Sequence, residues 1–226
     1  MGSGYYSERL SGKRLLQCYE VASARVRRYL ESELNHALKQ IRPGQSVLEL
    51  GCGYGRLLPP IAAKAGRIIG IDSSFDNLEY GREYLAGCGC RSFDLQVMDA
   101  ARLGFKEDHF DCVLCLQNGI SAFQVDQRAL ILEALRVLRP GGRALFSSYA
   151  ERFWNDRLEW FRLQAAAGLL GEIDEEQTRD GVIVCRDGFR ATTVTPAGFH
   201  ALLHGLNVQA NIVEVDGSSL FCEMTK

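Results

Sequence analysis

The sequence of 226 residues predicts one α/β domain with a doubly wound, mostly parallel sheet. Three observations lead to this expectation. Short apolar runs alternate with helical patterns between residues 47 and 148, which is typical of parallel strands joined by right-handed crossovers. A glycine-rich turn directly follows the first run, and acidic residues lie at or near the ends of the first three. The last two apolar runs instead flank Asp216–Gly217, which predicts a C-terminal antiparallel hairpin.

The elements of the first 148 residues follow from periodicity. Apolar residues recur every three or four positions over residues 10–41, which predicts a helix that Pro43–Gly44 ends. Beyond it, we expect strands at 47–50, 67–71, 93–98, 110–116 and 144–148, and helices at 57–65, 77–86 and 125–138.

The pattern changes after residue 148. An aromatic-rich helix is expected over 152–170, followed by two strands around Asp187–Gly188. Thr195 then caps a helix that has Pro196 at its first position. The chain therefore carries an α+β insertion between the fifth strand of the core and the terminal helix and hairpin.

Composition excludes several classes of partner. The formal net charge is −2, so no basic field is available for nucleic acid or anionic lipid. No apolar stretch reaches the length of a membrane span, and Met1–Gly4 begins no secretory signal. We therefore expect a cytoplasmic protein whose eight cysteines are free thiols.

The glycine-rich turn contains Gly51, Gly53 and Gly55. Glycine lets the backbone turn sharply and approach a ligand without a clash from a Cβ atom. The dinucleotide fingerprint needs one more residue before its last glycine, and that place is taken by Arg56. The spacing therefore favours a ligand that lacks a pyrophosphate.

Three acids, Glu49, Asp72 and Asp99, lie at or near the ends of successive strands. Open α/β sheets bind ligands at the carboxyl ends of their strands, and an acid about 20 residues beyond the turn meets ribose hydroxyls in doubly wound folds. Any one acid alone would be interpreted as a helix cap. Three acids in successive units, beside the glycine turn, indicate a ligand site instead.

The region 47–148 resembles the core of class I S-adenosylmethionine-dependent methyltransferases, and most closely the UbiE-like small-molecule subgroup. Four segments carry the resemblance: Val47–Gly55, Gly70–Ser74, Phe110–Val113 and Leu135–Gly142. The resemblance implies a Rossmann-like sheet of seven strands that the terminal hairpin completes. It also implies that S-adenosylmethionine is the cofactor and S-adenosylhomocysteine the product.

The resemblance implies a role for each residue of the cofactor site. Glu49 lies near the methionine amino group, Gly51, Cys52 and Gly53 border the methionine portion, Asp72 accepts from the ribose hydroxyls, Ser73 contacts adenosine, Asp99 and Ala100 meet the adenine, and Leu116 and Gln117 line the methionine end. With Asp72 facing a cleft, we expect Asp72→Ala to weaken cofactor binding but to change stability little.

The chain is thus predicted to be a single domain, 1–226, with four parts. These are a helical cap at 5–41, the cofactor-binding core at 47–148, a substrate-side insertion at 149–194, and a terminal helix and hairpin at 195–226. The predicted reaction is in-line transfer of the methyl group to a small molecule, by a monomer or homodimer. The acceptor atom stays open among oxygen, nitrogen, carbon, sulfur and arsenic.

The sequence names no catalytic residue, because an activated methyl group needs positioning above all, and a base only where the acceptor loses a proton. Candidate substrate contacts are Tyr6, Asn118, Tyr149, Trp154 and Trp160. For the aromatic residues, core packing is the alternative. Trp160 lies off the helix's apolar stripe, so a dimer contact is a further alternative for it.

Two other functions remain in view, a nicotinamide-dependent oxidoreductase and a methyltransferase-like protein that binds cofactor without turnover. No metal site is expected. Cys112 and Cys115 are three apart in a strand, which directs them to opposite faces. His200 and His204 are one helical turn apart but have no acid beside them.

Overall fold

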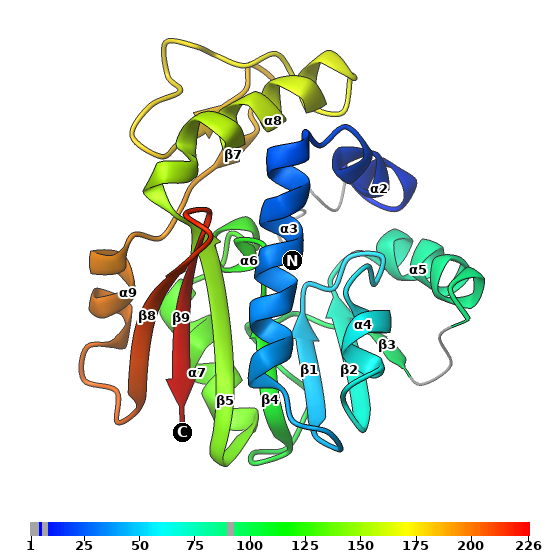
Figure 1. Cartoon of the computed structure of the whole chain (residues 1–226), viewed down its shortest axis with the longest axis vertical. Helices are drawn as coiled ribbons and strands as arrows, with labels where there is room; N and C mark the ends of the chain where they lie inside the picture. Colours follow the sequence, from blue (N-terminus) through cyan, green and yellow to red (C-terminus); the bar gives the residue numbers. More distant parts are fainter. Residues whose placement is uncertain (1–4, 6–8, 90–92) are drawn as a thin grey trace.

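The computed structural model describes Tyr5, residues 9–89 and residues 93–226, and its centre is a seven-stranded sheet (Figure 1). The strands are β1 (Ser46–Leu50), β2 (Arg67–Asp72), β3 (Asp94–Val97), β4 (Phe110–Cys115), β5 (Leu138–Tyr149), β8 (Gln209–Val215) and β9 (Ser219–Thr225). Their order is β3-β2-β1-β4-β5-β9-β8. The pairs among β1 to β5 are parallel, whereas β9 is antiparallel to both neighbours. The predicted fold class is confirmed.

Helices cover both faces of the sheet. One face packs against α6 (Gly119–Ala122), α7 (Gln127–Val137) and α9 (Pro196–Leu203), and the other against α3 (Ala24–Gln40), α4 (Leu58–Ala62) and α5 (Phe75–Gly87). Strand β4 serves both layers, with Cys115 in the first and Cys112 in the second, as their spacing predicts. Among the described residues no group of three or more potential metal ligands gathers. No described helix is long and apolar enough to cross a membrane.

The helix predicted over residues 10–41 is in fact two helices, α2 (Lys13–Glu20) and α3. The break falls before Ser23, whose hydroxyl accepts a hydrogen bond from the Val26 amide at 3.3 Å and caps α3. Because the apolar periodicity continues across this cap, periodicity alone does not reveal the break between the two helices. As a result α2 turns away from α3 and lies beside α5 and α8 (Figure 1).

The insertion, residues 149–194, contains a 3-10 turn (Glu151–Phe153), α8 (Trp154–Ala166) and a small hairpin of β6 (Ile183–Val184) and β7 (Arg190–Ala191). The helix ends four residues earlier than predicted because Gly168, at φ 68°, donates to Ala165 and the next amide donates to Gln164, a Schellman ending. A second apolar core joins the insertion to α2 and the start of α3.

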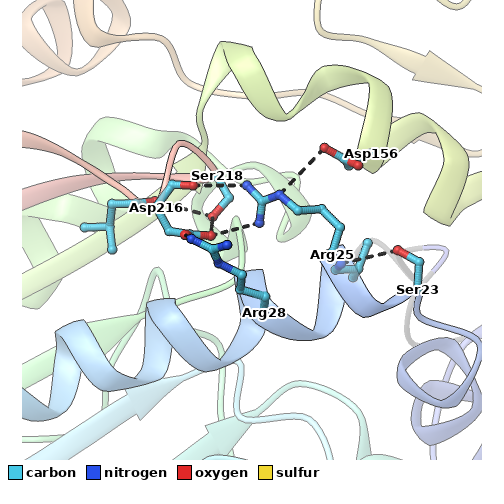
Figure 2. A network of polar contacts seen from close by, with 8 residues as sticks. Ser23, Arg25, Arg28, Asp156, Asp216 and Ser218 are labelled. Atoms are coloured by element: carbon cyan, nitrogen blue, oxygen red, sulfur yellow. Dashed lines mark hydrogen bonds and ion pairs between the residues drawn. The ribbon is translucent and has the colours of Figure 1, made fainter.

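A polar network fastens α3 to the turn between β8 and β9 (Figure 2). Arg25 and Arg28 both donate to the Asp216 carboxylate, at 2.8 and 2.5 Å, and Arg25 also lies 3.8 Å from Asp156 on α8. Ser218 donates to the same Asp216 carboxylate at 3.3 Å. Ion pairs, as well as apolar packing, therefore connect α3 to the insertion and to the C-terminal hairpin.

Candidate functional site

The glycine-rich turn joins β1 to α4. Gly51, Gly53 and Gly55 all have positive φ, at 67°, 55° and 81°, which side chains other than glycine rarely adopt. The Cys52 amide donates to Ile71 on β2 at 2.9 Å. A Cβ atom on Gly53 would lie 2.8 Å from Leu15 on α2. The turn is therefore held to β2 by a hydrogen bond and closely approached by Leu15 of α2 on another side.

Asp72 closes β2 and accepts three hydrogen bonds. Its Oδ2 accepts from the Gly53 amide at 2.8 Å, and its Oδ1 accepts from the Ser74 amide at 2.8 Å and from Nδ2 of Asn77 at 3.2 Å. Burial raises the pKa of Asp72, and these hydrogen bonds partly offset the effect. Asp72 thus connects the glycine turn to α5 in addition to any contact with a ligand.

The predicted adenosine contacts lie just past the ends of β2 and β3. Ser73 and Asp99 are exposed and Ala100 is half-buried, and Oδ1 of Asp99 accepts from the Ala101 amide at 2.9 Å. Sequence reasoning missed two apolar side chains at this end, Phe75 and Val97, each 56% exposed. Phe75 begins α5 and Val97 is paired with Asp72. The sequence signal for Phe75 is an apolar residue at the start of a helix, and the signal for Val97 is an apolar residue at the end of an edge strand.

A buried carboxylate and a guanidinium flank the glycine turn. Glu49, on β1, is 4% exposed, and among the described residues no hydrogen-bond partner reaches its Oε2. Burial raises the pKa of Glu49 to about 8, while Arg56 opposes that rise. Nε and Nη2 of Arg56 are also buried without a partner in the described part of the chain, and its guanidinium lies 4.6 Å from the Tyr19 ring centre. Unsatisfied buried polar atoms are rare, so this cluster needs an explanation.

The loop after β4 has an unusual backbone. Gln117 and Asn118 are consecutive non-glycine residues with positive φ, 55° and 59°, a conformation that persists only where surrounding contacts enforce it. The Gln117 amide donates to Glu33 at 3.2 Å, and Tyr19 donates to Oε1 of Gln117 at 2.6 Å. Nε2 of Gln117 is buried with no partner among the described residues. One atom of this loop is therefore available for a ligand.

Asn118 connects the same loop to the insertion. Its Nδ2 donates to the Thr192 carbonyl at 2.9 Å, and its Oδ1 accepts from Ser148 at 2.9 Å. Ser148 in turn accepts from the Val194 amide at 2.9 Å. Both polar atoms of Asn118 are occupied, so its predicted substrate contact has less support than its role in holding the loop.

Glu33 is a site residue that sequence reasoning missed. It lies on α3 with 1% of its surface exposed, and its Oε1 accepts from Ser147 at 2.6 Å as well as from Gln117. Burial raises the pKa of Glu33 to about 7. The sequence carries a signal for its burial. Glu33 lies four residues after Tyr29 and seven after Val26, which places this acid on the buried side of an amphipathic helix.

The predicted aromatic contacts belong to the second core. Trp160 is 5% exposed, donates to the Cys18 carbonyl at 2.7 Å and packs 6.1 Å from Tyr19. Tyr149 lies under the Arg157 guanidinium, and half-buried Trp154 is near the same group. Burial of Trp160 within one chain contradicts its interpretation as a dimer contact. Tyr6 lies outside the described residues.

Residues 47–142 match the family model of a methyltransferase domain. A structure of a putative S-adenosylmethionine-dependent methyltransferase from Methanococcus maripaludis superposes with a TM-score of 0.68 over 100% of this chain and 97% of that one, at 14% identity. These findings support a class I S-adenosylmethionine-dependent methyltransferase core at residues 47–142. The chain's sheet order and C-terminal hairpin form the fold of this family.

Two curated relatives show how much of this chain is similar to known proteins. The ubiquinone/menaquinone biosynthesis C-methyltransferase UbiE of Vibrio cholerae is 32% identical over 117 residues, which is 49% of this chain and 43% of that protein. An uncharacterized 37.1 kDa protein in transposon TN4556 of Streptomyces fradiae is 29% identical over 188 residues, 78% of this chain and 52% of that protein. The chain therefore spans about half the length, or less, of the curated relatives it matches.

In the structure the predicted cofactor residues fall into two groups. Hydrogen bonds join Gly53 to Asp72, and Tyr19 on α2 links Gln117 to the Arg56 side of the turn. Ser73, Asp99 and Ala100 lie further out, at the ends of β2 and β3. In the first group Gly53 is buried and Asp72 and Gln117 are half-buried, whereas two of the three residues in the second group are exposed.

Proposed function

We propose that the protein binds S-adenosylmethionine at the carboxyl ends of β1, β2 and β4 and transfers its methyl group to a small molecule. The unsatisfied buried atoms of Glu49 and Arg56 beside the glycine turn carry this proposal. The cofactor ends in an amino acid, with an ammonium and a carboxylate. Glu49 offers an acceptor that suits the ammonium, and Arg56 offers two donors that suit the carboxylate.

The outer residues suit the rest of the cofactor. Asp72, whose oxygens already accept from three donors, retains one acceptor site, on Oδ2, for a ribose hydroxyl. Ser73, Asp99 and Ala100 lie where the base would follow, and exposed Phe75 and Val97 offer apolar contact for its ring faces. Gly51, Cys52 and Gly53 border the methionine portion in this arrangement, and Leu116 and Gln117 line the methionine end.

When bound, the cofactor supplies a methyl group already activated on a sulfonium. The residues of the chain then have to orient it and exclude water. Tyr19 and Leu15 bring α2 over the glycine turn, and Trp160 holds α2 from the insertion side. We therefore assign residues 5–41 and 149–194 to the cap and the substrate side, 47–148 to the cofactor and 195–226 to the closing helix and hairpin.

The relatives favour a small acceptor, because they include a phosphoethanolamine N-methyltransferase and the ubiquinone/menaquinone biosynthesis C-methyltransferase UbiE. Those names describe the relatives. For this chain, the aromatic residues Tyr149, Trp154 and Trp160 support an acceptor site at the insertion. They pack behind the residues that contact the acceptor and are not themselves exposed contacts.

Calorimetric titration tests the proposal with S-adenosylmethionine, S-adenosylhomocysteine and NAD. The first two should bind and NAD should not. Arg56→Leu should weaken both by about 30-fold or more, because they share the amino acid end. Exposed Arg82 on α5 provides the matched control, Arg82→Leu, which should change neither. Tight NAD binding without a response to S-adenosylmethionine would favour the oxidoreductase alternative.

Turnover is tested separately, with S-adenosylmethionine labelled in its methyl group and a cell extract freed of macromolecules. We expect label to appear in extract compounds other than the cofactor, and Arg56→Leu to prevent it. Cofactor binding without any such transfer would favour the alternative without turnover.

A further inference from the structure

The site holds more acid than the amino acid end of the cofactor can use. Glu33 and Glu49 are buried, at 1% and 4% exposed, Asp72 is half-buried, and the charge of Arg56 acts on both glutamates. Buried charges normally need a partner of opposite sign. If Arg56 meets the cofactor carboxylate and Glu49 its ammonium, Glu33 is left without an opposite charge.

The contacts of Glu33 hold it at the end of the site where the methyl group is expected. Its Oε1 accepts from Ser147 on β5 and from the Gln117 amide after β4. Both donors favour the ionised carboxylate and fix its orientation. Gln117 is assigned above to the methionine end of the cofactor, and the sulfonium is part of that end.

We propose that Glu33 supplies the opposite charge for the sulfonium and makes the site prefer S-adenosylmethionine over S-adenosylhomocysteine. This inference rests on the proposed function. Methyl transfer leaves the electron pair of the broken carbon–sulfur bond on the sulfur, which becomes a neutral thioether. The attraction to Glu33 is then lost, and the product is held less tightly than the cofactor. Glu33 is thus a specificity-determining residue.

The surroundings of Glu33 allow this charge to respond to pH. Groups from several elements act on it or are acted on by it: Tyr19 from α2, Tyr29 from α3, Glu49 from β1, Arg56 from the turn, Cys115 from β4 and Tyr149 from β5. Burial raises the pKa of Glu33 to about 7, so near neutrality only part of it is ionised. A bound cation favours the carboxylate and releases a proton, whereas a neutral ligand does not.

The test compares affinities for S-adenosylmethionine and S-adenosylhomocysteine by calorimetry between pH 5.5 and 8. The ratio of the two should rise with pH through about 7, by about tenfold, as Glu33 ionises. Titration of Glu49 cancels in the ratio, because both ligands carry the same ammonium. Buffers of different ionisation enthalpy should reveal proton release on binding S-adenosylmethionine that is absent for S-adenosylhomocysteine.

Glu33→Gln keeps an oxygen for Ser147 and Gln117 but removes the charge. It should lower affinity for S-adenosylmethionine about tenfold or more, change that for S-adenosylhomocysteine within about twofold, and flatten the pH dependence of the ratio. The matched control is Glu31→Gln, at an exposed position of the same helix. Ser147→Ala removes a donor that favours ionisation, so it should move the midpoint of the ratio to higher pH.

The outcomes separate the two proposals. If neither ligand binds, the proposed function is wrong. If both bind but the ratio does not depend on pH in the wild-type protein, the role of Glu33 is wrong while the proposed function stands. That measurement needs no variant, so poor folding of Glu33→Gln would not protect the inference. Equal weakening of both ligands by Glu33→Gln would likewise reduce Glu33 to a structural residue.

Discussion

The glycine-turn region and the cover, by which we mean α2 and the insertion, are both buried but are held in different ways. In the turn region the main contacts join neighbouring units of the chain, as from Asp72 to Gly53, 19 residues apart. In the cover they join distant segments, as from Trp160 to Cys18, 142 residues apart. The family model matches the first region and stops before the insertion. Backbone geometry defines the turn region, whereas side-chain packing across the fold defines the cover.

This difference predicts which substitutions damage which property. A change in the cover should mainly lower the free energy of unfolding, and a change in the turn region should mainly lower cofactor affinity. Residues that contact both regions should show both effects in smaller measure. The following variants are ordered by the size of the expected effect.

Arg157→Ala should have the largest effect, a loss of about 3 kcal/mol in the free energy of unfolding. Arg157 is 1% exposed, donates to the Gly181 and Ala191 carbonyls, and lies over the Tyr149 ring. Its loss removes a donor from each of those carbonyls and opens space in the core of the insertion. Urea denaturation measures the loss. Arg162→Ala, exposed on the same helix, should be close to wild type, and a similar loss there would argue against a specific role for Arg157.

Asp72→Ala should weaken cofactor binding by about 2 kcal/mol. Against the expectation from the sequence, it should also lower stability by about 1 to 2 kcal/mol, because three donors lose their acceptor. Calorimetry and thermal melting measure the two effects. Asp72→Asn, which keeps one acceptor oxygen, should recover part of the stability but little of the affinity. Wild-type affinity in a destabilised Asp72→Ala protein would make Asp72 purely structural.

The same contrast explains what the sequence could predict. Positive φ at Gly51 and Gly53, and the acid at the end of β2, are local requirements of a βα unit, and local patterns carry them. The burial of Glu33 is a different case. Helical periodicity indicates that this face is buried, but the partners of Glu33 are Ser147 and the loop after β4, which are 114 and 84 residues away. No spacing in the sequence connects them.

The cover shows the same limit in its secondary structure. Periodicity predicted one helix over residues 10–41, but a single serine cap at Ser23 divides it and lets α2 reach the glycine turn. The predicted apolar stripe leaves out Trp160, but in the structure Trp160 lies on the buried side of α8. The stripe could not show that α2 covers that side, so a dimer contact was a reasonable but wrong alternative.

Trp160→Phe should have an intermediate effect. It keeps an aromatic ring but removes the donor to Cys18, so we expect a loss of about 1 kcal/mol in stability. Because α2 carries Tyr19, which donates to Gln117, the same change should raise the cofactor KM by a few fold. Trp154→Phe, at a half-buried position with no such link to α2, should alter KM little. If Trp154→Phe and Trp160→Phe change KM equally, α2 is not held through Trp160.

Asp216→Asn should have the smallest effect and tests the boundary between the two regions. Asp216 receives Arg25 and Arg28 of α3 in the turn between β8 and β9, away from the glycine turn (Figure 2). Asparagine tolerates the positive φ of 56° at this position, so the change removes charge without adding backbone strain. Since the Arg28 side chain is 70% exposed, water and salt screen its pair, and we expect a loss of about 0.5 to 1 kcal/mol in stability that shrinks in high salt. Arg28→Gln, which leaves the less exposed Arg25 pair in place, should lose less than half as much stability.

Thermal melting at two salt concentrations measures the stability of both variants, and S-adenosylmethionine affinity is the second readout. Because this network fastens α3 while touching none of the residues that meet the cofactor, affinity should stay at the wild-type value. A drop in affinity larger than that of Trp160→Phe would mean that the orientation of α3, and with it Glu33, depends on the C-terminal hairpin, and that the cover and the turn region are not independent.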